Sequence, residues 1–308
     1  MKTRIIVSAV LLPVFFAVLF ILPPIFLTII VSAICGVAAF ELLHATKISK
    51  HKRVLVYTII TAAFVPFAVY FGAIPTMAEN AIRIDEGLTP VIHMNIASTF
   101  FLITLLLSIF FIFICLLIIE AALAFRSKKA IEKGTQLKFR QIPIALAAGI
   151  LIPYMLSALI SLKCLPYGHL FVLLPIVSAF MTDSGAYFIG VAFGKTKPFP
   201  TISPNKTIEG YIGGLIIGTL GMVIYGVIIT STTTLNVILP VIIIYGILGA
   251  IVTELGDLAF SLIKRKCGIK DYGKLIPGHG GALDRFDSMS FCAPTMYLLT
   301  LTLPAIIV

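Results

Sequence analysis

Long apolar runs recur along this chain and constrain its fold more than any other feature. Each run holds roughly 20 residues, the length a helix needs to cross about 30 Å of hydrocarbon. The composition agrees with this, because 59% of the 308 residues are hydrophobic, 12% are charged and the mean hydropathy is +1.11. A soluble globular domain has far more charge and less apolar content. The sequence therefore predicts an integral membrane protein.

The runs predict an all-α fold with about nine transmembrane helices. They lack the inside–outside alternation of a membrane barrel strand, and the first is too long to be a removable signal peptide. The expected spans are residues 5–22, 24–42, 54–74, 97–120, 141–162, 169–193, 209–230, 237–263 and 289–308. An outer loop is expected near 75–96. We expect one membrane unit in which 1–165 forms about five amino-terminal helices and 166–308 about four catalytic helices with cytoplasmic motif loops.

The distribution of basic residues predicts the orientation. With a cytoplasmic amino terminus, 21 of the 23 lysines and arginines fall in inner segments, and only Arg83 and Lys163 fall outside them. Cytoplasmic loops of membrane proteins carry this excess. The net charge of +10 has two interpretations: attraction to anionic membrane lipids, or capture of a phosphorylated substrate. Nucleic acid is not implied. The five cysteines form no C-x-x-C pair, so neither a disulfide framework nor a zinc site is predicted.

Acidic residues inside apolar spans are costly and mark candidate functional sites. Five qualify. Glu41 and Glu120 lie near the cytoplasmic ends of their spans, and we expect them to be solvated at the interface. Asp183 lies deep in a Thr-Asp-Ser break, either as a functional group or in a hydrogen-bond cluster between helices. Glu254 and Asp257 share a helix stripe that leads toward the cytoplasmic surface.

The stretch 261–287 concentrates residues suited to phosphate chemistry. Its lysines and arginines are charge-assisted donors to phosphate oxygens, and they include Lys264, Arg265, Lys270 and Arg285. The turn that contains His279, Gly280 and Gly281 allows backbone N–H groups to approach a ligand just before a helix start. Asp284 and Asp287 are spaced i and i+3, and they offer hard oxygen ligands for Mg²⁺.

A second cytoplasmic segment, 203–210, opens the seventh expected helix. One interpretation is purely structural, with Thr207 or Ser203 capping that helix. The functional interpretation makes Lys206 a further phosphate ligand.

These motifs resemble the signature of the phosphatidate cytidylyltransferase family, also called CDP-diacylglycerol synthase. The match runs S-x-x-K-R, K-D-x-G, I-P-x-H-G-G and D-R-x-D over 261–287, and the upstream S-P-N-K-T-x-E-G and T-D-S segments also look like this family. The amino-terminal half matches only in its hydrophobic layout. Two positions depart from the pattern: Ala282 replaces a larger aliphatic residue, and Asn205 stands where a basic residue is expected.

The resemblance implies the reaction of CTP with phosphatidate to give CDP-diacylglycerol and pyrophosphate, with Mg²⁺ and room for a second cation. The residues it assigns to catalysis are Asp257, Lys264, Arg265, Asp284 and Asp287, of which Asp257, Asp284 and Asp287 bind or support metal. Those it assigns to substrate binding are Ser203, Lys206, Asp183, Lys270, His279, Gly280, Gly281 and Arg285.

Two other functions stay open at the level of sequence. A polyprenol kinase type of enzyme shares the CTP chemistry, and a cation-coupled transporter also carries intramembrane carboxylates, although its charges gather near the midplane. The expected partners are CTP, phosphatidate and membrane lipids, and a homodimer is left open. The expected location is a bacterial cytoplasmic membrane, with the active site on the cytoplasmic side.

Overall fold

The computed structural model describes residue 13 and residues 15–92, 95–126, 141–273 and 280–307. These residues are predominantly helical, and seven helical segments among them are long and apolar enough to cross a membrane. The prediction of an all-α polytopic membrane protein is therefore confirmed. The chain forms two compact units, each assembled from segments that are distant in the sequence.

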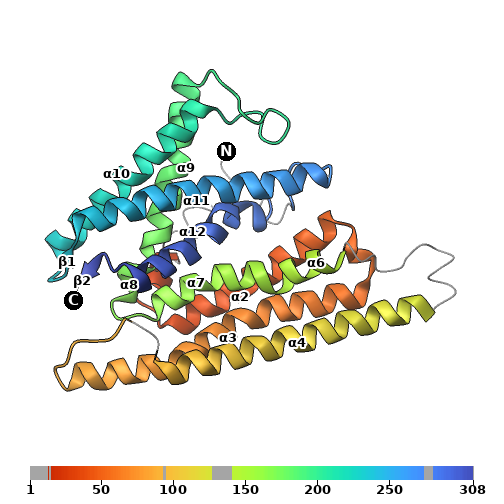
Figure 1. Cartoon of the computed structure of the whole chain (residues 1–308), viewed down its shortest axis with the longest axis horizontal. Coiled ribbons are helices and arrows are strands. Elements are labelled where there is room, and N and C mark those ends of the chain that lie inside the picture. Colours follow the sequence, from red (N-terminus) through yellow and green to blue (C-terminus); the bar gives the residue numbers. More distant parts are fainter. Residues whose placement is uncertain (1–12, 14, 93–94, 127–140, 274–279, 308) are drawn as a thin grey trace. The chain divides into compact units, whose positions relative to one another are not determined.

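The first unit comprises residues 1–75, 95–160 and 269–285. Its elements, which Figure 1 shows running largely side by side, are α2 (Pro24–Ala45), η1 (Ile48–Lys50), the first part of α3 (Lys52–Asp85), α4 (Ile96–Arg126), α6 (Ile142–Leu146), the π-helical turn η3 (Ala147–Leu151) and most of α7 (Ile152–Lys163). Pro24 occupies the first turn of α2, where a missing N–H costs nothing.

Small residues let the helices of this unit approach closely. A Cβ on Gly72 of α3 would lie 2.9 Å from the Cβ of Leu102 on α4. One on Gly149 of η3 would lie 3.0 Å from the ring of Phe113. Such contacts replace the hydrophobic driving force, which is weak between helices in lipid.

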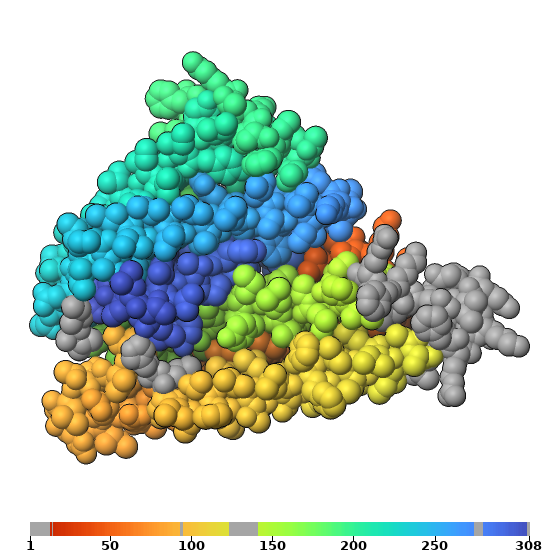
Figure 2. Space-filling model, viewed as in Figure 1, coloured from red at the N-terminus to blue at the C-terminus, as the bar shows by residue number. Residues whose placement is uncertain are grey.

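The outer face of this unit is apolar. Only 11% of the most apolar window of α4 is buried, and Figure 2 shows its side chains open along the length of the helix. Phenylalanine, leucine and isoleucine dominate these exposed positions, including Phe100, Leu107 and Phe111. This surface is suited to contact with lipid chains rather than water.

The second unit comprises residues 76–94, 161–268 and 286–308. Its elements are the end of α3, the end of α7, α8 (Gly168–Phe171), α9 (Leu173–Phe193), α10 (Ile208–Thr232), β1 (Asn236–Val237), α11 (Leu239–Lys266), α12 (Leu283–Thr302) from Phe286 onward, and β2 (Ile306–Ile307). The two short strands pair antiparallel, with Asn236 opposite Ile307. Helix α10 packs against both α9 and α11 (Figure 1).

Glycines make the contact between α9 and α10 very close. A Cβ on Gly185 of α9 would lie 2.6 Å from the Cβ of Ile217 on α10. Added side chains on Gly213 and Gly218 of α10 would likewise collide with α9. The spacing of these two helices therefore depends on residues without side chains.

Helices occupy eight of the nine expected spans. Most of the span expected at 5–22 lies outside the described residues, where only residues 13 and 15–20 are helical. The span expected at 289–308 corresponds to α12, which begins earlier and ends at Thr302; its charged first turn keeps it out of the seven apolar segments. The outer loop expected at 75–96 is wrong in its first half, because α3 continues to Asp85.

Candidate active site

The start of α10 positions Lys206 in the second unit. Thr207 is the helix cap, and its hydroxyl oxygen accepts the N–H of Gly210 at 3.1 Å. Glu209 in the first turn accepts the N–H groups of Lys195 and Thr196 at 3.1 and 3.2 Å. The predicted capping role is thus confirmed for Thr207, and these bonds fix the loop that carries Lys206.

Lys206 forms an ion pair with Asp257 of α11, with each side chain 24% exposed. Its ammonium group also lies 5.3 Å from the ring centre of Tyr211. Burial acts against the charged amine, but the negative charge and hydrogen bond of Asp257 outweigh it and raise the pKa of Lys206. The sequence placed these two residues about 50 positions apart, and the structure brings them together.

A second ion pair joins α11 to α12. The amine of Lys264 lies 3.7 Å from Oδ2 of Asp287, and the side chains are only 10% and 11% exposed. Asp287 also lies within electrostatic reach of Asp257, so these two carboxylates repel each other. The binding of a cation would reduce the repulsion between the carboxylates of Asp257 and Asp287.

Asp183 of α9 completes the cluster of charged groups in the second unit. Its Oδ2 accepts a hydrogen bond from the hydroxyl of Ser288 on α12 at 3.3 Å. This bond agrees with the hydrogen-bond cluster between helices that the sequence left open. Asp183 also acts electrostatically on Lys206 and Asp287, so it lies within reach of both ion pairs.

Other members of the α11 stripe surround this cluster. The hydroxyl of Ser261 donates to Oδ1 of Asp257 at 3.4 Å. In the part of the chain that is described, Oε1 of Glu254 is buried without a hydrogen-bond partner, beside the position that a Cβ on Gly214 would fill. The stripe predicted from the sequence is therefore polar and faces the interior of the second unit.

In the first unit, the carboxylate of Asp284 accepts backbone hydrogen bonds from two residues of the signature stretch. Its Oδ2 accepts the N–H groups of Tyr272 at 2.8 Å and Gly281 at 3.1 Å. Gly280 between them has a φ of +88°, which favours a residue without a side chain. Asp284 thus already acts as an acceptor for backbone groups at both ends of the loop.

Glu41 is the residue that the sequence interpretation missed. It was expected to be solvated at the membrane interface, but this is wrong because it is only 4% exposed. Its two carboxylate oxygens accept the N–H groups of Ala282 and Leu283 at 3.0 and 2.9 Å. Glu120, set aside for the same reason, instead pairs with the exposed Arg53 at 3.4 Å. Glu41 differs from Glu120 in its hydrogen-bond partners, which lie more than 240 residues away in the sequence. No sequence pattern indicates such a contact.

The remaining predicted residues are less enclosed. Lys270, Arg265 and Arg285 are exposed, and Ser203 is half-buried. Arg265 donates from Nε to the carbonyl of Ile202 at 3.0 Å and so holds the 201–206 segment against α11. His279 lies outside the described residues.

The donor set of the second unit fits a divalent cation in its chemistry. Asp183, Asp257 and Asp287 offer hard oxygen ligands, and these three carboxylates exceed the two neighbouring lysines by one charge. Among the described residues, no three acidic, cysteine or histidine side chains have the spacing of a metal site. In this arrangement the lysine amines of Lys206 and Lys264 neutralise Asp257 and Asp287.

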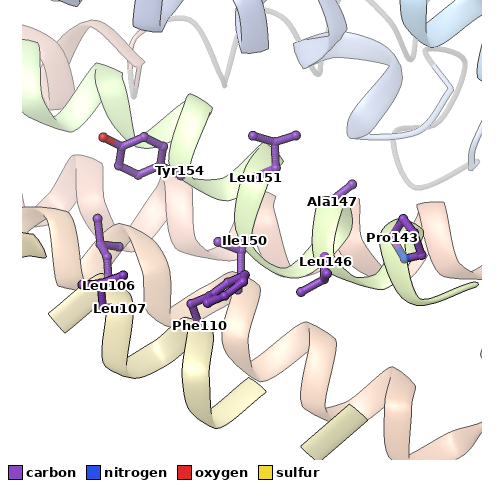
Figure 3. Close-up of a pocket in the computed structure, with 9 residues that line it drawn as sticks. All are labelled: Leu106, Leu107, Phe110, Pro143, Leu146, Ala147, Ile150, Leu151 and Tyr154. Atoms are coloured by element: carbon purple, nitrogen blue, oxygen red, sulfur yellow. The ribbon is translucent and has the colours of Figure 1, made fainter. Parts of the chain in front are cut away.

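A separate groove in the first unit has the opposite character. Its lining residues come from α4, α6, η3 and α7 (Figure 3). The volume of the groove is about 510 Å³. Tyr154 supplies its only polar side chain, beside residues such as Leu107, Phe110 and Ile150. The described residues that line this groove offer no cation to a phosphate group, so the lining matches hydrocarbon and not a nucleotide.

Comparison with known proteins finds relatives that share part of this sequence. A phosphatidate cytidylyltransferase of Bacillus subtilis is 41% identical over 133 residues, which are 43% of this chain and 48% of that protein. A phosphatidate cytidylyltransferase of Staphylococcus haemolyticus is 43% identical over 132 residues, which are 43% of this chain and 49% of that protein. The chain thus spans about half the length of the curated relatives it matches. The model of the cytidylyltransferase family, in contrast, matches residues 2–303. The match covers nearly the whole chain, and the protein therefore belongs to the cytidylyltransferase family.

Proposed function

We propose that this protein transfers a cytidylyl group from CTP to phosphatidate, giving CDP-diacylglycerol and pyrophosphate. The observation that carries the proposal is the pairing of Lys206 with Asp257 and of Lys264 with Asp287 in one unit. Lys206, Lys264 and Asp287 belong to the motifs that resemble the phosphatidate cytidylyltransferase signature, and Asp257 lies four residues before the first of them on α11. The names of the matched relatives support the same reaction.

The proposed reaction is a direct displacement. An anionic oxygen of phosphatidate attacks the α-phosphorus of CTP, the bond to the bridging oxygen breaks, and pyrophosphate leaves. Lys206 and Lys264 neutralise the charge that accumulates on phosphate oxygens, and the exposed Arg265, Lys270 and Arg285 add positive charge that attracts an anionic substrate. Exchange of labelled pyrophosphate into CTP by enzyme stripped of lipid would contradict this mechanism, because it requires a cytidylyl–enzyme intermediate.

Magnesium is part of the proposal. Asp257 and Asp287 would hold the ion, and Asp183 is the neighbouring carboxylate. Asp284, one turn before Asp287 in α12, stays a predicted support of the metal site. A bound Mg²⁺ supplies positive charge that neutralises phosphate oxygens, and a second cation could share the same carboxylates. Removal of divalent ions with EDTA should abolish turnover, and added Mg²⁺ should restore it. Full activity in EDTA would remove the metal from the mechanism.

The proposed site faces the cytoplasm, where CTP is available, and the proposed membrane is the bacterial cytoplasmic membrane. The excess of basic residues in the inner segments supports this orientation. Phosphatidate, with its chains in the bilayer, would approach from the lipid side.

Labelled CTP tests the reaction directly. Purified protein is incubated with phosphatidate, Mg²⁺ and CTP labelled at either the α- or the γ-phosphate, and the lipid is extracted. Label in the lipid from the α position only is expected. Label from the γ position only would indicate a lipid kinase, and no label from either position would contradict both enzyme functions. Protein with Asp257→Asn serves as the control for contaminating activity.

A further inference from the structure

The carboxylate of Glu41 holds the start of a helix far from it in sequence. Glu41 lies near the end of α2 and is only 4% exposed. Its Oε1 accepts the N–H of Ala282 at 3.0 Å, and its Oε2 accepts the N–H of Leu283 at 2.9 Å. Hydrogen bonds between backbone N–H groups and an ionised carboxylate are stronger than those between neutral groups. Both oxygens are thus committed to the first residues of α12.

Two glycines of the signature leave room for this carboxylate. A Cβ on Gly281 would lie 2.6 Å from both oxygens of Glu41, and a Cβ on Gly273 would lie closer still to Oε1. Neither contact is compatible with an ordinary side chain. The sequence suggested that Gly281 lacks a side chain so that a ligand can approach. In the structure, the space is filled by Glu41.

Asp284 is a second carboxylate that holds the start of α12. We call Glu41 and Asp284 together the clamp. Its Oδ2 accepts the N–H of Gly281, and Glu41 accepts those of Ala282 and Leu283. Three consecutive donors at the beginning of a 20-residue helix are therefore satisfied by two carboxylates of the protein itself. A phosphate that bound to these N–H groups would have to displace them.

We infer that Glu41 is a positioning residue of the active site, because it fixes the segment Gly281–Leu283 and with it the orientation of Asp284. The inference rests on the proposed function, in which this segment belongs to the nucleotide-binding side of the site. Both oxygens of Glu41 accept backbone N–H groups, so its effect on the site passes through the start of α12.

Glu41→Gln tests the clamp with little change in shape. The amide nitrogen of glutamine is a donor, so one of the two backbone N–H groups loses its acceptor. Glu120→Gln is the matched control, because Glu120 is also an acidic residue on a helix of the first unit and its structural partner is the exposed Arg53. Amide hydrogen exchange in peptides that cover 280–286 should be at least ten-fold faster in Glu41→Gln than in the native protein or the control.

The kinetic consequence separates positioning from general destabilisation. In the α-label assay, kcat/KM for CTP should fall at least ten-fold in Glu41→Gln, while KM for phosphatidate stays within two-fold and the protein remains monodisperse. A loss of activity that merely follows the fraction of unfolded protein would overturn the inference, as would unchanged exchange at 280–286. Native protein that transfers no α-label would refute the proposed function instead, whereas active native protein with a fully active Glu41→Gln refutes only the role of Glu41.

A double substitution tests the role of the glycine. Gly281→Ala should lower kcat/KM at least ten-fold because its methyl group collides with the carboxylate. In the Glu41→Ala background the same change should cost less than two-fold, since the obstructing group is gone. Additive losses would show that Gly281 is needed for another reason and would overturn the steric part of the inference.

Discussion

Replacing Gly185 by alanine should separate α9 from α10 and displace the charged cluster. The added Cβ would lie 2.6 Å from the Cβ of Ile217 and 2.9 Å from the carbonyl oxygen of Gly213. Carbon atoms in contact prefer about 3.5–4.0 Å, so the helices must move apart by roughly 1 Å. Asp183 lies two residues before Gly185, and its hydrogen bond to Ser288 is already 3.3 Å long. A shift of that size would break the bond.

The stability change is the sum of two opposing terms. Overpacking of this kind costs about 1–3 kcal/mol, whereas alanine in a helix interior gains about 0.5–1 kcal/mol over glycine. We expect a net loss of roughly 1–2 kcal/mol and a lower apparent unfolding temperature in detergent. A displacement of about 1 Å at the site should reduce kcat for cytidylyl transfer about 100-fold, even well below that temperature.

Gly36→Ala is the matched control. A Cβ on Gly36 of α2 would meet its nearest neighbours at 3.8 and 3.9 Å, which is ordinary contact. This variant should be unchanged in activity and slightly stabilised, by about 0.5–1 kcal/mol. If Gly185→Ala and Gly36→Ala gave the same unfolding temperature and the same kcat, the argument from close helix packing would be refuted.

Three further predictions concern charge. Lys206→Met leaves the partly buried Asp257 without its cation, and kcat/KM should fall about 100-fold, or ~2.7 kcal/mol; a change of less than three-fold in steady-state assays would contradict this role. Asp287→Asn keeps the shape of the side chain but removes its charge, so turnover should fall by about two orders of magnitude or more while membrane insertion stays normal; near-native activity at limiting Mg²⁺ would exclude Asp287 as a metal ligand. A reporter fused after Lys129 should be cytoplasmic and one fused near Asp85 external, and the reverse pattern in a protease-accessibility assay would place the site where CTP is absent.

The sequence determined that this protein lies in a membrane, and it indicated most of the charged residues in the candidate site. Apolar runs of bilayer length leave helices as the only way to satisfy the backbone, so the all-α membrane fold followed directly. Charged residues inside or beside these runs are costly enough to mark candidate sites, and Asp183, Asp257 and Lys264 were selected in this way. The capping role of Thr207 was also local information.

Tertiary structure alone decided which of these groups are partners. Lys206 was predicted to meet phosphate, and its ion pair with Asp257 depends on how α10 and α11 pack. The continuation of α3 to Asp85 was missed because its last turns are polar, and polar residues in sequence look the same in a loop and on a solvated helix. Glu41 and Gly281 show the limit most clearly. A carboxylate near a helix end is usually solvated, and only the fold brings it to the N–H groups of α12, where burial and hydrogen bonding give it a different role.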